Sequence, residues 1–541
     1  MVSRRSPTLH LMNQGSKLDN RAGAMAALAK GVECDLAVIG GGATGLGVAL
    51  DAAARGFSVV LLESHDFAKG TSSRATKLVH GGVRYLAQGN ISLVREALHE
   101  RTTLLANAPH LAQPLPFVMP SYKVWEAPFY GVGLKLYDAL AGKAGLGPTE
   151  FLSRRETLAL LPNTRHSGPA GDLKGGVKYW DGQFDDARLA LALARTAAAQ
   201  GALLVNYCAA TRLLYENGKI AGLQVKDQET GQTYDVKAKC VVNAAGVWVD
   251  HFRMEDGQAL GRDVKAMVAP SQGVHVVVDR SFLPGSHAML IPKTADGRVL
   301  FAVPWLGKTI LGTTDTPRQD LAREPLPFKE ELEFILGESA RYLTKAPTHA
   351  DIKSIWVGLR PLVKPADDDG DNTQGLSREH TVLASKSGLI TVTGGKWTTY
   401  RAMAEDVLDK IFSADILPGR AGGVTAHMRL LGAQTMSQKI SDAPGIHLYG
   451  SEKAAVLALP GAQRELGGGL TEAMVRFAAR HEYARTVEDV LARRSRLLFL
   501  DARLAASLAP EVSQLLQEET GVNPLLSDFL ALCKQYLHLP D

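Results

Sequence analysis

The chain has 541 residues, 45% of them hydrophobic and 21% charged, which is ordinary for a large globular protein with more than one core. Its 60 basic and 56 acidic residues give a net charge of +4, and a balance this close to neutral disfavours nucleic acid as a partner. Four scattered cysteines without a CxxC pair argue against a disulfide framework and favour a reducing compartment. No apolar run reaches the roughly 18 residues that a transmembrane helix needs.

Residues 1–33 are predicted to form an N-terminal extension. They contain few acids, and no long apolar stretch follows Arg4 and Arg5, which disfavours a secretory signal. A disordered extension is the favoured interpretation, and a mitochondrial transit-like segment stays open.

Residues 35–63 carry the pattern of a dinucleotide-binding unit. A short apolar strand runs into Gly40, Gly42 and Gly45, a helical pattern follows, and a second strand ends at Glu63. The glycines allow a tight turn, a close approach to a pyrophosphate and close packing of the helix on the strand. Glu63 is placed to accept hydrogen bonds from ribose and to repel a 2′-phosphate. The pattern therefore predicts a site for FAD or NAD rather than NADP.

Three further segments are expected to return to the same cofactor. Residues 70–86 are rich in small and hydroxylated residues that could wrap it, although a polar surface loop is the alternative. Residues 241–250 form another strand-then-glycine turn, and at 390–411 a strand, two glycines and a helix follow one another. The N-terminus of that helix would stabilise a negative group. The residues expected to contact the cofactor are Gly40, Gly42, Thr44, Gly45, Glu63, Thr71, Ser72, Ser73, Lys77, His80, Gly81, Gly82, Ala245, Gly246, Gly395, Lys396, Trp397 and Thr398.

Nine segments resemble, in the same order, those of the FAD-dependent glycerol-3-phosphate dehydrogenase family. They are TSSRATKLVHGGVRYL (71–86), DARLALA (186–192), VVNAAGVWVD (241–250), QGVHVVVD (272–279), IPKTADGRVLFAVPW (291–305), LGTTDT (311–316), VGLRPLV (357–363), SREHTV (377–382) and GGKWTTYR (394–401). The resemblance covers about residues 34–405.

The resemblance implies that FAD takes a hydride from sn-glycerol 3-phosphate, giving dihydroxyacetone phosphate, and that quinone reoxidises the cofactor. It also implies peripheral membrane association on the cytoplasmic side, with a mitochondrial location left open, and we expect a homodimer. The alternatives are a glycerol-3-phosphate oxidase that uses dioxygen and an amine or 2-hydroxy-acid oxidoreductase. A nucleic-acid-binding flavoprotein is less favoured.

The resemblance places Arg84, Tyr85, Arg360, Arg378 and Lys396 around the substrate. Arginine suits a dianionic phosphate because its planar fork binds two oxygens at once. For any one of these cations, an ordinary surface charge is the alternative. Arg360 and Lys396 are also expected to act in catalysis.

His275 lies in an alternating run, 273–278, that predicts a strand. It is the best histidine candidate for a base or a substrate contact, and a core histidine is the competing interpretation. Members of the resembled family often carry lysine where this chain has Gln272, which puts any role of that position in doubt. No metal site is expected, because His481 and Glu482 lack the second histidine of a zinc motif.

The predicted fold class is α/β, with a Rossmann-type FAD-binding domain assembled from discontinuous segments, a β-rich substrate domain and a small α-helical C-terminal domain. The FAD-binding domain is expected at 34–110, 185–264 and 356–416, the substrate-binding cap at 111–184 and 265–355, and the helical domain at 425–541. Six arginines near 476–496 suggest a basic membrane-facing surface, with solvated helix faces as the alternative.

Overall fold

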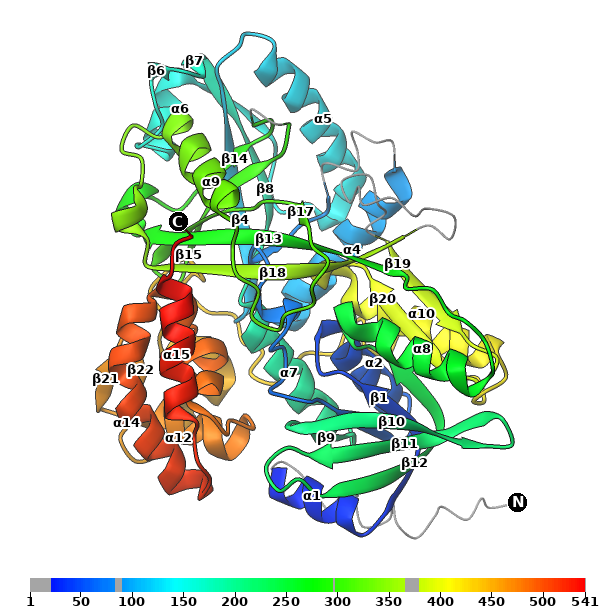
Figure 1. Ribbon diagram of the computed structural model, residues 1–541. Coiled ribbons are helices and arrows are strands. Elements are labelled where there is room, and N and C mark those ends of the chain that lie inside the picture. Colours follow the sequence, from blue (N-terminus) through cyan, green and yellow to red (C-terminus); the bar gives the residue numbers. More distant parts are fainter. Residues whose placement is uncertain (1–20, 83–89, 295–296, 365–378, 541) are drawn as a thin grey trace.

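The computed structural model describes residues 21–82, 90–294, 297–364 and 379–540. Figure 1 shows a sheet flanked by helices at the lower right, a larger sheet above it, and a group of helices at the lower left. Among the helices of these ranges, none combines the length and the apolar character needed to span a bilayer.

The first sheet is of the Rossmann type, and its central strand is β1 (Val32–Ile39). This strand runs parallel to β2 (Val59–Leu62) on one side and to β12 (Thr233–Asn243) on the other. The apolar run at its end is buried on both faces, as is typical of a parallel strand covered by helices. β9 (Leu203–Val205) and β20 (Ile390–Gly394) join the same sheet, so distant segments assemble it, as predicted.

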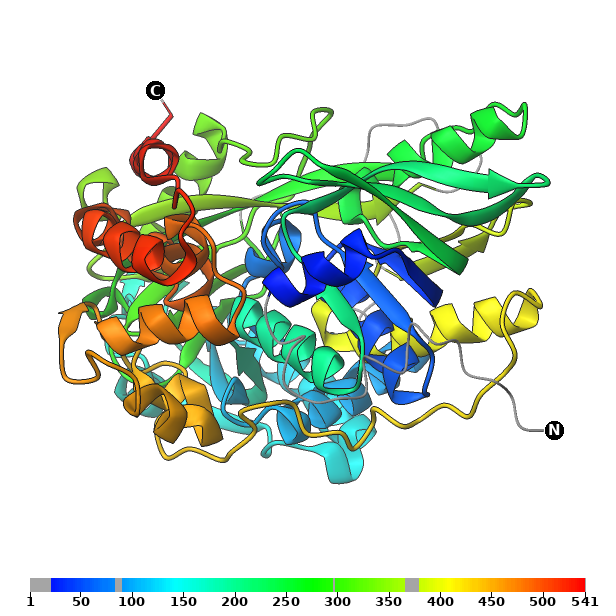
Figure 2. The same ribbon diagram turned by 90° about the horizontal axis from the view of Figure 1, so that it is seen from below.

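Helices cover both faces of this sheet. On one face, α2 (Ala43–Ala54), α7 (Asp186–Ala199) and α10 (Tyr400–Ser413) share a single apolar core with the strands. Figure 2 shows α1 and the first strands, in dark blue, in the middle of the molecule. The same sheet carries β10 (Cys208–Glu216), β11 (Lys219–Asp227), β19 (His380–Ala384) and, close by, α8 (Val249–Ala259).

Residues 21–33, which were expected to belong to the N-terminal extension, are instead part of the folded domain. They form α1 (Arg21–Ala29) and the start of β1. Ala24 and Leu28 are buried on the sheet face opposite α2, and Arg21 forms an ion pair with Asp227. The expected extension is therefore too long at its C-terminal end.

The second, larger sheet is antiparallel for most of its width. β4 (Ala112–Ser121) pairs with β8 (Gly175–Phe184), and β13 (Val268–Asp279) pairs with β18 (Ser354–Val363), both antiparallel. β13 and β18 cross the middle of the molecule side by side (Figure 1). Residues 356–363 were expected in the FAD-binding domain, but β18 belongs to this cap sheet. Its pairing with β13 places Arg360 opposite Ser271.

Shorter elements complete the cap. Its remaining strands are β3 (Leu78–Val79), β5 (Glu150–Ser153), β14 (Ala288–Ile291), β15 (Leu300–Trp305), β16 (Lys308–Gly312) and β17 (Thr316–Pro317), and its helices include α4 (Ile91–Asn107), α5 (Glu126–Ala141), α6 (Arg154–Leu160) and α9 (Lys329–Tyr342).

The C-terminal part is helical, as predicted, and shares a core with the cap sheet. α12 (Glu472–His481), α14 (Ala502–Thr520) and α15 (Leu526–Leu537) pack around residues that are continuous with the cap residues Trp305 and Trp356. This shared core makes the C-terminal helices part of the main body of the protein.

The C-terminal arginines pair with acids, so they do not form the basic membrane-facing surface that the sequence suggested. Arg493 and Arg494 both bind the buried carboxylate of Asp66, which follows β2. Arg496 binds Asp185 and Asp186 at the start of α7. The others pair as well: Arg476 and Arg480 with Glu519, and Arg485 with Glu229.

Candidate active site

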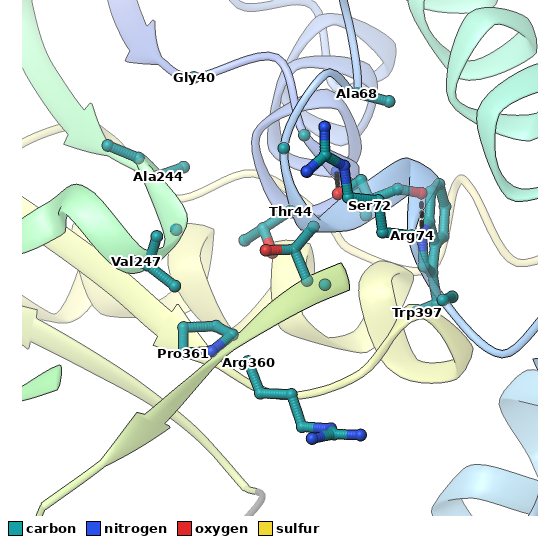
Figure 3. A pocket seen from close by; sticks show the side chains of 18 of the residues that line it. Gly40, Thr44, Ala68, Ser72, Arg74, Ala244, Val247, Arg360, Pro361 and Trp397 are labelled. Atoms are coloured by element: carbon teal, nitrogen blue, oxygen red, sulfur yellow. Dashed lines mark hydrogen bonds between the residues drawn. The ribbon is translucent and has the colours of Figure 1, made fainter. Parts of the chain in front are cut away.

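A cavity of about 710 Å³ is lined by residues of both sheets. Figure 3 shows Gly40, from the turn after β1, and Thr44, from the first turn of α2, together with Arg360 and Pro361 of β18. One continuous space therefore joins the dinucleotide turn to the cap sheet.

The glycine turn has the geometry that the sequence predicts. Gly40 has φ +107°, a backbone conformation that favours glycine. Gly42 lies close to Ser72, whose Oγ accepts a hydrogen bond from the N–H of Ala43 (2.9 Å). Gly45 is not among the described residues that line the cavity; a Cβ there would lie 1.9 Å from the carbonyl oxygen of Gly40. Its role is to let α2 pack on the turn.

We expect Gly45→Ala to destabilise the protein by about 1–3 kcal/mol and to weaken retention of the cofactor, because α2 must move away from the turn. Gly337→Ala, inside α9, is the matched control, since its Cβ would meet nothing within 4 Å. That control should gain up to about 1 kcal/mol of stability. The readouts are the flavin absorbance per protein and the melting temperature. A Gly45→Ala protein as stable and as yellow as its parent would contradict this account.

Glu63 ends β2 at the wall of the cavity. Its carboxylate accepts hydrogen bonds from the N–H groups of Gly41 (2.7 Å) and His65 (2.9 Å). Burial raises the pKa of this carboxyl above its usual value. The backbone contacts fix the carboxylate where a ribose could meet it.

Two segments that are far apart in sequence are tied together at the cavity. The indole N–H of Trp397 donates to the carbonyl of Ser72 (2.8 Å), as the dashed line in Figure 3 marks, and the Thr398 hydroxyl donates to the carbonyl of His80 (3.4 Å). The helix that was expected near 398–411 begins as a short 3₁₀ turn and continues as α10. Most residues predicted to contact the cofactor line this cavity: Gly40, Gly42, Thr44, Glu63, Thr71, Ser72, His80, Ala245, Gly246, Gly395, Lys396, Trp397 and Thr398.

Ser73, Lys77, Gly81 and Gly82 were also predicted to contact the cofactor, but they are not among the described residues that line the cavity. Gly81 instead packs against the side chain of Tyr137, leaving no room for a Cβ. The carbonyl of Ser73 accepts a hydrogen bond from Lys77 Nζ (2.8 Å).

Lys77 lies completely buried behind the cavity wall. Its ammonium forms an ion pair with Asp186 (2.7 Å) and lies 4.6 Å from the ring centre of Trp356. Burial lowers the pKa of Lys77 to about 7 against the opposing effect of Asp186. The polar sequence around it suggested a cofactor contact, whereas the side chain turns toward α7.

Arg360 is fixed at the cap end of the cavity. Its guanidinium donates to the Thr314 carbonyl (2.9 Å) and the Thr313 hydroxyl (3.2 Å), and Asp315 lies 3.4 Å away. A Cβ at Gly273 would lie 2.3 Å from Arg360 Nη2, so the glycine makes room for the guanidinium. These contacts hold a planar cation at the cavity wall, where an anion could bind.

His275 lies near Arg360 on the neighbouring strand, buried but at the cavity wall. Its ring stacks on Trp356 with centres 4.1 Å apart, and Nε2 lies 3.0 Å from the Thr76 hydroxyl. Burial, helped by Lys77 and Arg360, lowers the pKa of His275 well below its usual value, so the imidazole is neutral at physiological pH. The side chain thus has the packing of a core residue together with a position that a base would need.

The other substrate candidates divide into three groups. Lys396 lines the cavity between Gly395 and Trp397. Arg84, Tyr85 and Arg378 lie outside the described residues. Gln272 does not face the cavity in the described structure; its buried amide bonds to Glu331 and Arg318.

Sequence reasoning missed several residues of the wall. Arg74 and Trp248 belong to segments that were singled out, so their positions carried a signal. Lys69, Arg323 and Thr313 also line the cavity, and for Arg323 the sequence carries no such signal because it follows β17 in an irregular stretch. The guanidinium of Arg74 forms an ion pair with the carboxylate of Glu324 (Nη2 to Oε1, 2.6 Å).

The lining fits FAD. The glycine turn and the N-terminus of α2 suit a pyrophosphate, and a Cβ at Gly246 would meet nothing within 4 Å, so the wall is open there. Cavities that bind cofactors commonly measure about 300–1,000 Å³. Within the described ranges, no group of three or more metal-binding side chains is present.

Comparison with known proteins agrees with this geometry. Residues 35–401 match the family described as FAD dependent oxidoreductase, and residues 423–524 match the C-terminal domain of alpha-glycerophosphate oxidase. The fold and the cavity are thus those of an FAD-dependent oxidoreductase.

The more similar relatives narrow this class. A probable mitochondrial glycerol-3-phosphate dehydrogenase of Caenorhabditis elegans is 40% identical over 94% of this chain and 73% of its own length. The mitochondrial glycerol-3-phosphate dehydrogenase of Homo sapiens is 41% identical over 90% of this chain and 70% of its own length. The crystal structure of the glycerol-3-phosphate dehydrogenase of Bacillus halodurans with FAD is 30% identical, with a TM-score of 0.75 over 96% of this chain and 98% of that one. The chain belongs to the FAD-dependent glycerol-3-phosphate dehydrogenase family.

Proposed function

We propose that this protein oxidises sn-glycerol 3-phosphate to dihydroxyacetone phosphate, with FAD as the hydride acceptor and quinone as the final electron acceptor. One observation carries the proposal. Arg360 and the neutral His275, on the paired cap strands β18 and β13, line the same cavity whose other end holds the dinucleotide turn. The family relationship supports the same substrate.

Each residue has a distinct part in this proposal. Arg360, oriented by Thr313 and Thr314, binds the phosphate through its planar fork. His275 accepts the hydroxyl proton at Nε2, the atom that lies beside Thr76 at the cavity wall. Bound FAD supplies the acceptor for the hydride on carbon 2.

Anaerobic mixing of the purified protein with glycerol 3-phosphate tests the substrate. The flavin absorbance should bleach rapidly, and plain glycerol should leave it unchanged. A flavin that stays oxidised with glycerol 3-phosphate would refute the substrate, and amines and 2-hydroxy acids would then be screened. Adding quinone or air separates the acceptors, because an oxidase would form peroxide in air. Sedimentation of the same sample tests the expected homodimer.

We expect Arg360→Lys to raise KM for glycerol 3-phosphate by roughly 10- to 100-fold, since an ammonium cannot bind two phosphate oxygens in the same plane. The turnover number should change less. Arg503→Lys, at an exposed position of α14, is the matched control and should leave both constants unchanged. An unchanged KM in Arg360→Lys would remove this residue from the phosphate site.

A further inference from the structure

Residues 318–326 run between β17 and α9 without forming a helix or a strand, and we call them the cap strap. Arg318 anchors the strap to the cap. Its guanidinium donates to the Leu326 carbonyl (2.8 Å) and to the side-chain oxygen of Gln272 on β13. Side-chain contacts therefore take the part that backbone pairing has in a regular element.

The cap strap reaches the cavity wall at Arg323. The guanidinium of this residue lies 4.9 Å from the ring centre of Trp248, and both residues line the cavity. The Trp248 indole N–H donates to the carbonyl of Leu321 (3.2 Å), which ties the ring to the strap. Trp248 directly precedes α8, whose His251 and Phe252 also line the cavity. The strap thus meets the FAD-binding domain at the wall of the cofactor cavity.

Arg323 brings a positive charge to this wall. Across the described ranges, its guanidinium forms no ion pair with a carboxylate. The Glu63 carboxylate feels this charge, since burial raises the pKa of Glu63 and Arg323 opposes the rise. Burial lowers the pKa of His65 to about 4, and Arg323 acts in the same direction, so this imidazole is neutral at physiological pH. The guanidinium therefore lies near the carboxylate that is expected to meet the ribose of the cofactor.

Two other cations beside the strap are already paired with carboxylates. Arg74 forms an ion pair with Glu324 (2.6 Å), and Lys69 forms ion pairs with Glu488 (2.6 Å) and, less closely, with Glu324 (3.6 Å). Arg74 also donates to the main-chain carbonyl of Arg323 (3.1 Å). Glu324 therefore ties the strap to the wall segment 69–74 at the residue next to Arg323.

We propose that Arg323 binds the diphosphate of FAD from the cap side, and that Glu324 is the positioning residue that holds it there. The glycine turn and the N-terminus of α2 present backbone N–H groups to the diphosphate. A guanidinium that is not committed to a carboxylate adds charge and a planar pair of donors. FAD as the cofactor follows from the family, so this proposal does not depend on the proposed substrate.

Release of FAD from the purified holoprotein tests the role of Arg323. After dilution, the fluorescence of released flavin should rise about 10- to 100-fold faster in Arg323→Gln than in the parent, because a charge-assisted contact is lost. Arg323→Lys keeps the charge and should release FAD more slowly than Arg323→Gln. Arg503→Gln, at an exposed position of α14, is the matched control and should release FAD as the parent does.

The visible absorption spectrum of the bound flavin tests the place of Arg323. It should be the same in Arg323→Gln and in the parent, because Glu63 meets the adenosine end of FAD and the flavin ring lies away from it. An unchanged spectrum also shows that the variant keeps an intact cofactor site. A shifted spectrum would place Arg323 beside the flavin ring and overturn the inference.

A double variant tests the positioning role of Glu324. Glu324→Gln should release FAD roughly 3- to 10-fold faster than the parent, and high salt should speed its release less, because salt screens the lost ion pair. Glu330→Gln, at an exposed residue of α9, is the control. Arg323→Gln combined with Glu324→Gln should release FAD no faster than Arg323→Gln alone, since Glu324 acts through Arg323.

Three results would overturn the inference. The first is release from Arg323→Gln at the rate of Arg503→Gln, and the second is equal release from Arg323→Gln and Arg323→Lys. The third is a double variant in which the two effects multiply, which would give Glu324 a structural role that is independent of Arg323.

Discussion

Replacing Asp66 with asparagine should lower the free energy of unfolding by about 3–5 kcal/mol, because it removes the carboxylate that the buried cations of Arg493 and Arg494 share, although Arg493 keeps its ion pairs with Glu488 and Asp489. Although burial acts to raise it, the pKa of this carboxyl is held below its usual range by Arg494 and Arg493. A depressed pKa means that the carboxylate stabilises the fold above its unfolded pKa of about 3.8 and that this contribution is lost as the pH falls further.

Denaturant titration at neutral and at acidic pH measures both effects. The parent should lose stability in acid more steeply than Asp66→Asn, which no longer has this carboxylate. Asp172→Asn is the matched control, because Asp172 is 67% exposed in a long ion pair with Lys174 (3.9 Å). The control should change stability by less than about 0.5 kcal/mol. If Asp66→Asn has the same denaturation midpoint as the control, the ion pairs of Asp66 with Arg493 and Arg494 do not hold the C-terminal helices to the first sheet.

Replacing His275 with asparagine should lower kcat by roughly 10²- to 10⁴-fold, which is the range expected for loss of a general base. The flavin content should stay close to that of the parent, because the hydrogen bond of the His275 side chain is with the Thr76 hydroxyl, outside the glycine turn. His349→Asn, at an exposed histidine beside Glu333, serves as the control and should keep full activity.

The pH profile gives a second readout for His275. Because burial places the folded pKa well below 6.5, protonation of this imidazole should cause no loss of kcat/KM as the pH falls through 6.5. A descending limb near 6.5 that disappears in His275→Asn would contradict the buried, neutral imidazole. Activity within a few-fold of the parent in His275→Asn would instead favour the core histidine.

Local sequence was enough to predict the dinucleotide unit. The apolar strand, the spaced glycines and the carboxylate at Glu63 all lie within one short stretch, and the structure brings them together as the pattern requires. The return of residues 394–398 to the cavity was expected from the strand–glycine–helix pattern together with the family resemblance, and these residues do line the cavity. Contacts between neighbours in sequence leave a periodic signal, and here that signal was sufficient.

Long-range pairing explains the errors. Lys77 is sequestered by Asp186, 109 residues away, and Arg493 by Asp66, 427 residues away. Neither partner lies in the sequence around the cation. The polar segment 70–86 was therefore interpreted as contacting the cofactor through Lys77, and the arginines near 476–496 as a membrane-facing surface. Residues 357–363 were singled out only by the family resemblance, and it is the pairing of β18 with β13 that decides that this strand belongs to the cap sheet.

The cavity is lined by segments that the ribosome makes at very different times. Its glycine turn follows β1, whereas Lys396 and Trp397 follow β20, which pairs with β12 in the same sheet. A nascent chain therefore presents the glycine turn while residues 394–398, which complete the wall, are still to be translated. FAD cannot be fully enclosed until β20 has left the exit tunnel, so cofactor uptake falls late in biosynthesis, after the cap sheet has had time to form.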